Sequence, residues 1–396
     1  MTLQRVAIVA DYLEERWPSM DLIANMLLRE LNTHHKERVV ASLLRPRFVR
    51  RFSGARIWGE KKHLFNADRL LNRFIDYPRF VRTCRRQFDA YHIVDHSYGH
   101  LAAAAGPERC VVTCHDLDTF RCIVEPHRET RSIPYTAMAR RILHGLRSAE
   151  AIACDSVGTR NELLQYGIAP TDRLSVNPNG VADTFTTEPH PLAEAEMRSI
   201  LGPPDGDRVE IVHVGSTIPR KRIDVLIRVA TALRRVRPSV RILRVGGAFT
   251  PSQCELVDDL AMPADAVRVL PFVNPEVLAA VYRRSVITLL PSESEGFGLP
   301  VLESLACGTP VVLSDIPVLR EIGGPAAVFC PVANVTRWTD AILSLIDERR
   351  SDPQTWAERV AVGIKWASQF TWKDYADRAV RLYETVASSH YAQGRT

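Results

Sequence analysis

The sequence contains no apolar run close to the ~20 residues that a membrane-spanning helix requires, although 46% of its 396 residues are hydrophobic. Residues 1–5 lead straight into an apolar segment, without the pattern of a secretory signal peptide. The eight cysteines are scattered, mostly in apolar runs, and show no paired spacing typical of a metal site. We therefore expect a cytoplasmic protein with reduced, structural thiols and enough chain for two hydrophobic cores.

Acidic residues are scarce in one basic segment, Arg45–Arg86. It holds 13 lysines and arginines against three acidic residues, a local balance of +10, whereas the whole chain carries +5. Aromatic residues lie among these cations. The composition suits an anionic membrane surface or lipid headgroup, an acidic saccharide, or a simple solvated basic face. No nucleic-acid recognition motif accompanies the charge, so we expect no nucleic-acid partner.

Short apolar strands alternate with helical segments along the chain, and no short-period repeat is present. Strands are predicted at 6–10, 39–44, 92–95, 110–114, 151–154, 210–215, 240–245, 267–270 and 286–290. Helices are predicted at 20–31, 64–90, 133–146, 223–236 and 276–284. This alternation predicts an α/β chain with parallel, doubly wound sheets.

Residues 177–180 read Asn-Pro-Asn-Gly, a cluster of residues that break regular structure. We place a domain boundary near residue 183, which gives an N-terminal domain over 1–183 and a C-terminal domain over 184–368. A final helix is predicted over 369–390. Its apolar positions are Trp372, Tyr375, Ala379 and Leu382.

The segment 286–308 combines an apolar strand, a glycine-bearing loop and a helix whose first position suits Pro300. Such a junction directs free backbone N–H groups and a positive helix end at one point, which suits a phosphate. Glu295 lies on the loop and Glu303 in the first helical turn, where each can accept hydrogen bonds from sugar hydroxyls. The combination predicts a nucleotide-sugar pocket. Spacing alone also fits an ordinary turn with solvated glutamates.

A family resemblance supports the pocket. Glu295-Gly-Phe-Gly-Leu-Pro-Val-Leu-Glu303, followed by Ala306-Cys-Gly-Thr-Pro-Val-Val312, resembles the donor-site signature of the retaining glycosyltransferase family 4. The resemblance covers most of the chain, strongly over 209–325 and loosely before 150. It implies the GT-B fold, in which two Rossmann-like domains face each other across a cleft that holds the active site. The N-terminal domain would then bind the acceptor and the C-terminal domain the nucleotide-sugar. The resemblance also implies that the helix over 369–390 crosses back onto the N-terminal domain, although its sequence alone also fits a helix that packs on its own domain.

The resemblance also implies roles for single residues of this motif. Glu303 would accept the ribose hydroxyls, and Glu295 would orient the donor at the transferred sugar or diphosphate. The backbone amides that would meet the diphosphate are those of Gly296, Phe297, Gly298 and Leu299. Val273, after the strand at 267–270, is expected near the base.

Residues 113–117 resemble the family's His-Asp stretch, whose histidine contacts the donor sugar, and this implies a catalytic role for His115. Taken alone, a histidine at a strand end also fits a capping or packing role, and Asp116 fits a loop or cap. The family's first loop usually carries glycines, whereas residues 14–20 here contain none. We therefore assign that loop no role.

Residues 219–222 read Pro-Arg-Lys-Arg, and Lys221 matches the family's diphosphate lysine. The family commonly has an arginine directly after the glycine that ends the preceding strand. Here Gly215 is followed by Ser216, which can offer only a neutral hydrogen bond. Arg220 or Arg222 is then left to supply the missing charge.

Stabilising the charge on a departing diphosphate is the main electrostatic task of such a reaction. Asp116 and Asp118 form an Asp-x-Asp pair, but it adjoins His115 rather than the donor motif. We therefore expect no metal and no cofactor, with cations and the helix end in the metal's place.

The sequence thus predicts a retaining, metal-independent glycosyltransferase that moves a sugar from a UDP- or GDP-sugar to a hydroxyl of a glycan or lipid-linked acceptor. The product would be a cell-surface or exported polysaccharide. If the basic segment meets anionic lipid, the protein lies at the inner face of the membrane. Two alternatives remain open, a nucleotide-sugar-binding protein without transferase activity and a nucleotide-sugar epimerase on the same scaffold.

Overall fold

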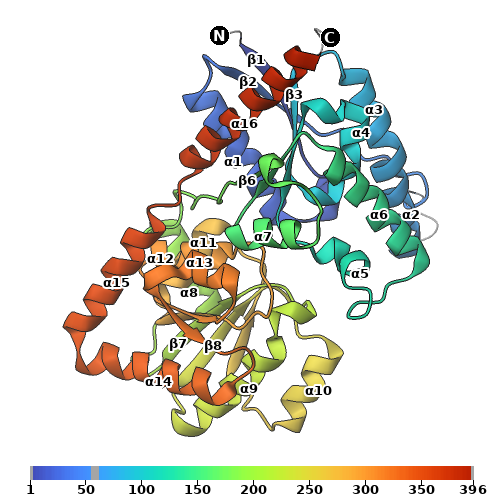
Figure 1. The fold of residues 1–396 in the computed structure, drawn as a ribbon. Helices are drawn as coiled ribbons and strands as arrows, with labels where there is room; N and C mark the ends of the chain where they lie inside the picture. The colour runs from blue at the N-terminus through green and yellow to red at the C-terminus, as the bar shows by residue number, and fades with distance from the viewer. Residues whose placement is uncertain (1–2, 55–61, 394–396) are drawn as a thin grey trace. The chain divides into compact units, whose positions relative to one another are not determined.

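The structure is a computed structural model that describes residues 3–54 and 62–393. It divides into two compact units, which are Met1–Asn179 with Trp372–Thr396, and Gly180–Thr371 (Figure 1). The division falls within the Asn-Pro-Asn-Gly breakers, a few residues before the boundary expected near 183. The last helix, α16 (Trp372–Gln393), is grouped with the first unit.

The first unit contains one sheet of six parallel strands in the order β2-β1-β3-β4-β5-β6. The strands are β1 (Gln4–Val9), β2 (Val39–Leu44), β3 (Ala90–Ile93), β4 (Cys110–Cys114), β5 (Ala151–Cys154) and β6 (Leu174–Val176). The other α-helices are α1 (Pro18–His34), α2 (Lys62–Leu71), α3 (Tyr77–Cys84), α4 (Ala102–Ala105), α5 (Arg121–Val124), α6 (Ile133–Ser148) and α7 (Val157–Gln165).

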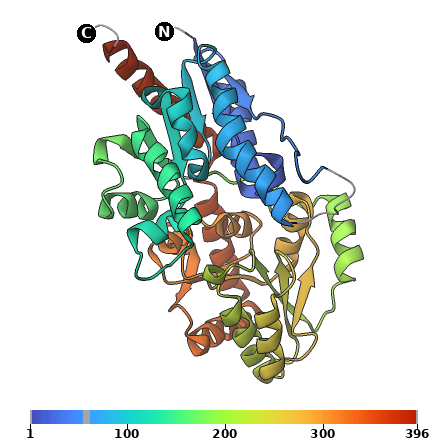
Figure 2. The same cartoon turned by 90° about the vertical axis from the view of Figure 1, so that its right-hand side faces the viewer.

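Helices cover both faces of this sheet, as Figures 1 and 2 show, so its central strands are buried along their length. Helix α16 packs against α1, β3, β4 and β5. Its Tyr383 hydroxyl lies 2.6 Å from His92 Nδ1, and His92 Nε2 lies 2.7 Å from Thr113 Oγ1. The buried face of α16 therefore includes Tyr383 rather than the predicted Leu382, which is half-buried.

The single helix predicted over 64–90 is wrong. Helix α2 ends at Leu71, a π-helical turn spans Asn72–Asp76, α3 ends at Cys84, and Ala90 already begins β3. The wider π turn directs Asn72 inward, where its amide bonds both the N–H and the C=O of Val49. Within the basic segment, residues 55–61 lie outside the described residues.

The second unit contains another sheet of six parallel strands, in the order β12-β11-β10-β7-β8-β9. The strands are β7 (Val209–Val214), β8 (Val240–Val245), β9 (Val267–Leu270), β10 (Ile287–Leu290), β11 (Val311–Ser314) and β12 (Ala327–Cys330). The α-helices are α8 (Pro191–Leu201), α9 (Ile223–Val236), α10 (Pro251–Asp259), α11 (Pro275–Arg284), α12 (Leu299–Ala306), α13 (Pro317–Gly323), α14 (Val335–Ser351) and α15 (Pro353–Ala367).

Successive residues of these strands pack on opposite faces of the sheet. Ile211 and Ile242 lie in a core with α9 and α14, whereas Val212 and Leu243 pack with α8 and α11. The doubly wound architecture is therefore as predicted, although strands β6, β11 and β12 were not expected from the sequence. In the described part of the chain, no helix is both long and apolar enough to cross a membrane.

The strand order of the second unit reverses between β7 and β10. One half of the sheet extends from β7 through β8 and β9, and the other from β10 through β11 and β12. In doubly wound sheets, ligands bind outside the carboxyl ends of the strands at such a switch point. The loops that leave this point are residues 215–222 after β7, here named the basic loop, and residues 291–298 after β10, here named the donor loop.

Candidate donor site

The donor loop and α12 have the strand–loop–helix form expected from the sequence. Gly298 precedes α12 with φ of +97°, a conformation that side chains rarely adopt, and a Cβ there would lie 3.1 Å from Leu319 Cδ2. Helix α12 begins at Leu299, so Pro300 is its second residue and not its first. Glu303 consequently lies in the second turn, and its predicted place in the first turn is wrong.

Glu295 joins the donor loop to the basic loop. Its buried carboxylate accepts hydrogen bonds from Lys221 Nζ at 2.6 and 2.8 Å and from Ser292 Oγ at 2.7 Å. Arg220 Nη1 lies 3.4 Å from the same carboxylate and donates to the carbonyl of Ser294 at 2.9 Å. Two residues predicted for the site, Lys221 and Glu295, thus form one ion pair at the switch point.

The amides predicted to meet a diphosphate lie beside this ion pair. The Phe297 side chain is buried in the core under α12, so only its backbone is available to a ligand. Leu299 opens α12, where the first N–H groups have no carbonyl one turn earlier to accept them. A partial positive charge from the helix therefore adds to the charges of Lys221 and Arg220.

Glu303, in the second turn of α12, is also buried. The Tyr282 hydroxyl donates a hydrogen bond to its Oε2 at 3.0 Å. Burial raises the pKa of Glu303 to about 7, and the Tyr282 hydrogen bond only partly offsets this. The side chain therefore loses its proton near neutral pH and not in the acidic range usual for a glutamate. Such a carboxyl group can accept a hydroxyl hydrogen bond most strongly once it has lost its proton.

The remaining residues predicted for the donor site differ in the contacts that they make. Arg222 pairs with Asp224 at 2.7 Å and with Glu293 at 3.3 Å, so Arg220 is the arginine that reaches Glu295. Gly215 and Ser216 lie at the start of the basic loop. Val273 is partly buried in the loop after β9. Neither Ser216 nor Val273 contacts Glu295 by a hydrogen bond among the described residues.

In the first unit, His115 follows β4 and is buried. Its Nδ1 lies 2.5 Å from Asp155 Oδ2, and its Nε2 lies 2.8 Å from the carbonyl of Val94. Burial opposes a charge on the ring, but Asp155, with Asp95 and the Val94 carbonyl, raises the pKa of His115 to about 9. The ring is therefore an imidazolium that donates from both nitrogens, and the donor-sugar contact implied for it stays a prediction.

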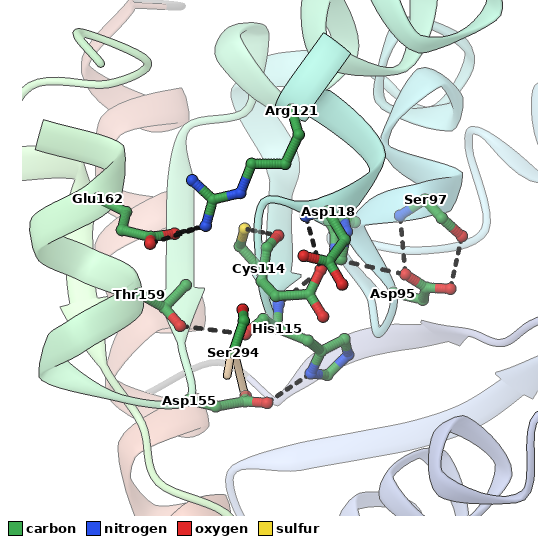
Figure 3. A network of polar contacts seen from close by, with 12 residues as sticks. Asp95, Ser97, Cys114, His115, Asp118, Arg121, Asp155, Thr159, Glu162 and Ser294 are labelled. Atoms are coloured by element: carbon green, nitrogen blue, oxygen red, sulfur yellow. Dashed lines mark hydrogen bonds and ion pairs between the residues drawn. The ribbon is translucent and has the colours of Figure 1, made fainter. Parts of the chain in front are cut away.

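Further polar groups surround His115 at the carboxyl edge of its sheet (Figure 3). Asp95, which follows β3, accepts hydrogen bonds from the N–H and hydroxyl of Ser97 at 2.7 and 2.5 Å. Asp116 accepts from the N–H of Asp118 at 3.0 Å, which fits the loop role considered for it. Within the described residues, no group of three or more His, Cys, Asp and Glu side chains is arranged to hold a metal ion.

Sequence reasoning missed three charged residues at these sheet edges. Asp11, which follows β1, is buried near Asp95, and this burial and the second carboxylate raise its pKa well above the usual range. Asp155 follows β5 and orients His115. Arg244 lies inside β8 and is fully buried. The one signal for all three was a charged residue inside or directly after an apolar run.

Each of the two units matches the model of a known family. Residues 24–185 match the model of Glycosyltransferase Family 4, and residues 195–361 match that of Glycosyl transferases group 1. The chain belongs to glycosyltransferase family 4. The resemblance seen in the donor motif therefore extends through both units.

Curated relatives of this family 4 chain include a D-inositol 3-phosphate glycosyltransferase from Thermobispora bispora, which is 33% identical over 59% of this chain and 56% of the relative. The O-antigen chain mannosyltransferase B of Escherichia coli is 28% identical over 70% of this chain and 71% of its own length. The chain thus spans little more than half the length of the first of these relatives.

Solved structures show the same fold. Sucrose-phosphate synthase from Thermosynechococcus elongatus superposes with a TM-score of 0.71 at 19% identity, over 98% of this chain and all of that chain. Anabaena HepE in complex with UDP-glucose gives a TM-score of 0.70 at 17% identity, over 96% of this chain and all of that chain. The family 4 chain therefore has the predicted GT-B class of fold, built from two Rossmann-like units.

Proposed function

We propose that this chain is a retaining, metal-independent glycosyltransferase that moves a sugar from a UDP- or GDP-sugar to a hydroxyl of a glycan or lipid-linked acceptor. The observation that carries the proposal is the ion pair of Lys221 and Glu295 beside the start of α12, at the switch point of the second sheet. It gathers two cations, helix amides and a carboxylate at the place where a doubly wound sheet binds its ligand.

These groups fit the chemistry of a nucleotide-sugar donor. Lys221, Arg220 and the α12 amides would stabilise the negative charge that develops as the diphosphate leaves. In a front-face reaction, the acceptor oxygen bonds to the anomeric carbon as the bond to the diphosphate breaks on the same face. The acceptor's proton then passes to the departing diphosphate, so no enzymic nucleophile is needed and the anomeric configuration is retained.

The relatives support this donor class without naming the donor of this chain. HepE was solved with UDP, with UDP and glucose, and with UDP-glucose. A thermal-shift panel of nucleoside diphosphates and their sugars tests the proposal, because a ligand at a hundred times its Kd adds about 2.7 kcal/mol of stability. Turnover of the stabilising donor in the presence of a chelator, with the product anomer read by NMR, then tests metal independence and retention. No stabilisation by any donor would refute the proposal.

Donor affinity is expected to rise with pH through about 7, the pKa to which burial raises Glu303. The carboxylate form accepts ribose hydroxyls more strongly than the neutral acid, and we expect several-fold tighter binding at pH 8 than at pH 6. A UDP-sugar or GDP-sugar is the right probe, because its diphosphate is esterified at both ends and keeps a constant charge there. Isothermal titration calorimetry over this range measures the effect.

The Glu303→Gln variant should bind the donor weakly and with a flat pH profile, since its amide does not titrate. A donor analogue without the ribose 2′-hydroxyl should lose the pH dependence in the natural protein. A profile that stays steep in Glu303→Gln would assign the titration to another group and remove Glu303 from the ribose site.

We also propose that the basic segment contacts an anionic membrane surface. Its start is fixed in place, because the buried carboxylate of Asp68 accepts the backbone N–H groups of residues 51–53. In the same stretch, Arg47, Arg50 and Phe52 are all exposed. Cations beside an exposed aromatic ring suit a layer of anionic headgroups.

Removing two of these cations in an Arg47→Gln, Arg50→Gln variant is expected to weaken binding to phosphatidylglycerol-containing vesicles by about 2 kcal/mol, or roughly 30-fold. Vesicle sedimentation measures this. The matched control is Arg349→Gln with Arg350→Gln, which removes two exposed arginines from the end of α14. Equal loss in the control, or equal binding to uncharged phosphatidylcholine vesicles, would argue for a solvated basic face.

A further inference from the structure

Arg244 is a fully buried arginine near the carboxyl end of β8. In the sheet it lies beside His213 of β7, with which it is in register. Its guanidinium bonds the carbonyl of Gly247 and makes a long contact of 3.4 Å to the carbonyl of Gly215. It also lies 5.5 Å from the centre of the Phe249 ring. The side chain therefore links the start of the basic loop to the loop that follows β8.

No carboxylate among the described residues pairs with this cation. Two nearby arginines do have a carboxylate partner: Arg241 on the same strand pairs with Glu210, and Arg222 pairs with Asp224. Arg244 has only carbonyl oxygens, and its Nε has no partner in the described part of the chain. Burial alone lowers its pKa from the usual arginine value. A buried cation without an acid is unfavourable unless an anion compensates it.

The two carbonyls that Arg244 holds also fix the direction of two N–H groups. The peptide bonds are trans, so the N–H of each peptide unit points opposite to its C=O. With the Gly215 and Gly247 carbonyls turned toward Arg244, the N–H groups of Ser216 and Ala248 point away from it. Neither N–H has a hydrogen-bond partner among residues 3–54 and 62–393.

Glycine is required for this close approach of the two loops. A Cβ on Gly246 would lie 1.9 Å from the carbonyl oxygen of Gly215, and Gly246 has φ of +131°. Gly247, with φ of +102°, also occupies a conformation that other residues rarely adopt. The pair of glycines therefore lets the loop after β8 approach the start of the basic loop, at the edge of the sheet that also carries Lys221.

We propose that Arg244 is a positioning residue of a diphosphate site: by holding the carbonyls of Gly215 and Gly247, it presents the amides of Ser216 and Ala248 to the anion. Its own charge lies directly behind these two peptides. The inference rests on the proposed function and names a residue that shapes its diphosphate site. The diphosphate then meets amides, Lys221 and Arg220 from the front and Arg244 from behind.

The test compares Arg244→Met and Arg244→Lys with the natural protein by calorimetry, using inorganic pyrophosphate, UDP, GDP, uridine and guanosine as probes. We expect Arg244→Met to weaken binding of pyrophosphate and of the preferred nucleoside diphosphate at least roughly tenfold, the worth of a lost charge-assisted interaction. Affinity for the phosphate-free nucleoside should not change. A general loss of structure would instead weaken nucleoside binding as well.

Arg244→Lys keeps the charge but lacks the planar fork that reaches two carbonyls, so its affinities should lie between those of the other two proteins. If Arg244→Met does not fold, the comparison of Arg244→Lys with the natural protein still tests the inference. The matched control is Arg241→Met, which removes an arginine from the same strand but leaves Arg244 in place, and it should bind pyrophosphate normally.

Pyrophosphate affinity that is unchanged in both Arg244 variants, or loss of the nucleoside together with the diphosphate, overturns the inference while the proposed function stands. If instead the natural protein binds pyrophosphate but no nucleoside diphosphate or donor, the proposed function fails. A weakened pyrophosphate affinity in Arg244→Met would then still support the anion site.

Discussion

Glu295→Gln is expected to lower donor turnover 100-fold or more, on the order of the effect of removing one preorganised charge contact at a reacting centre, while nucleoside diphosphate still binds. The carboxylate of Glu295 holds Lys221 Nζ at 2.6 Å and anchors the donor loop through Ser292. In the proposed site it also orients the transferred sugar. Turnover assays of the donor selected by thermal shift measure the loss of turnover, and calorimetry with UDP or GDP measures the retained binding of nucleoside diphosphate.

Nucleoside diphosphate affinity in Glu295→Gln should equal or exceed that of the natural protein. Glu295 is the carboxylate that competes with a diphosphate for Lys221, so its removal frees the lysine charge for the ligand. Lys221→Met should do the reverse and weaken diphosphate binding strongly. An enzyme is distinguished from a binding protein without a transfer step by measurable turnover that is lost in Glu295→Gln while the nucleoside diphosphate still binds.

The neighbouring Glu293→Gln variant is the control for Glu295→Gln. Glu293 is on the same loop, but it pairs with Arg222 at 3.3 Å and is exposed. It should leave turnover within a few-fold of the natural value. If Glu295→Gln turns over the donor as the natural protein does, Glu295 has no catalytic role and the proposed site loses its central residue.

Asp155→Asn is expected to destabilise the first unit by about 3 kcal/mol at pH 6 and by much less above pH 9. Asp155 is the main group that raises the pKa of buried His115 from 6.5 to about 9. A raised histidine pKa means that the folded state binds the proton more tightly, by about 1.4 kcal/mol per pKa unit. The contribution is complete below pH 6.5, declines from there to about 9, and is lost above it.

Urea unfolding at pH 6, 8 and 9.5 measures this difference, with a probe in the first unit because two units need not unfold together. The control is Asp172→Asn, which removes an exposed carboxylate from the same unit. Its unfolding free energy should follow that of the natural protein at each pH. If Asp155→Asn lowers stability equally at all three values, the pair does not hold His115 as an imidazolium.

The sequence predicted most of the strands and the fold class because each strand is a short apolar run between helical segments. The run at 110–114 and the run at 240–245 have the bounds that the structure shows. The helix predicted over 64–90 failed because helical periodicity continues through the π turn at 72–76, where only the inward contacts of Asn72 reveal the change. Periodicity reports local conformation and is insensitive to such an insertion.

The sequence by itself determined two doubly wound α/β units and a motif that carries Glu295 and Glu303 on one loop and helix. Only the tertiary structure decided that Lys221 pairs with Glu295 across 74 residues and that His115 pairs with Asp155 across 40. It also decided that Arg244 is buried without an acid. The reason is that the pairing of distant side chains follows from the order of strands in the sheet, with β7 beside β10, and chain order does not specify this.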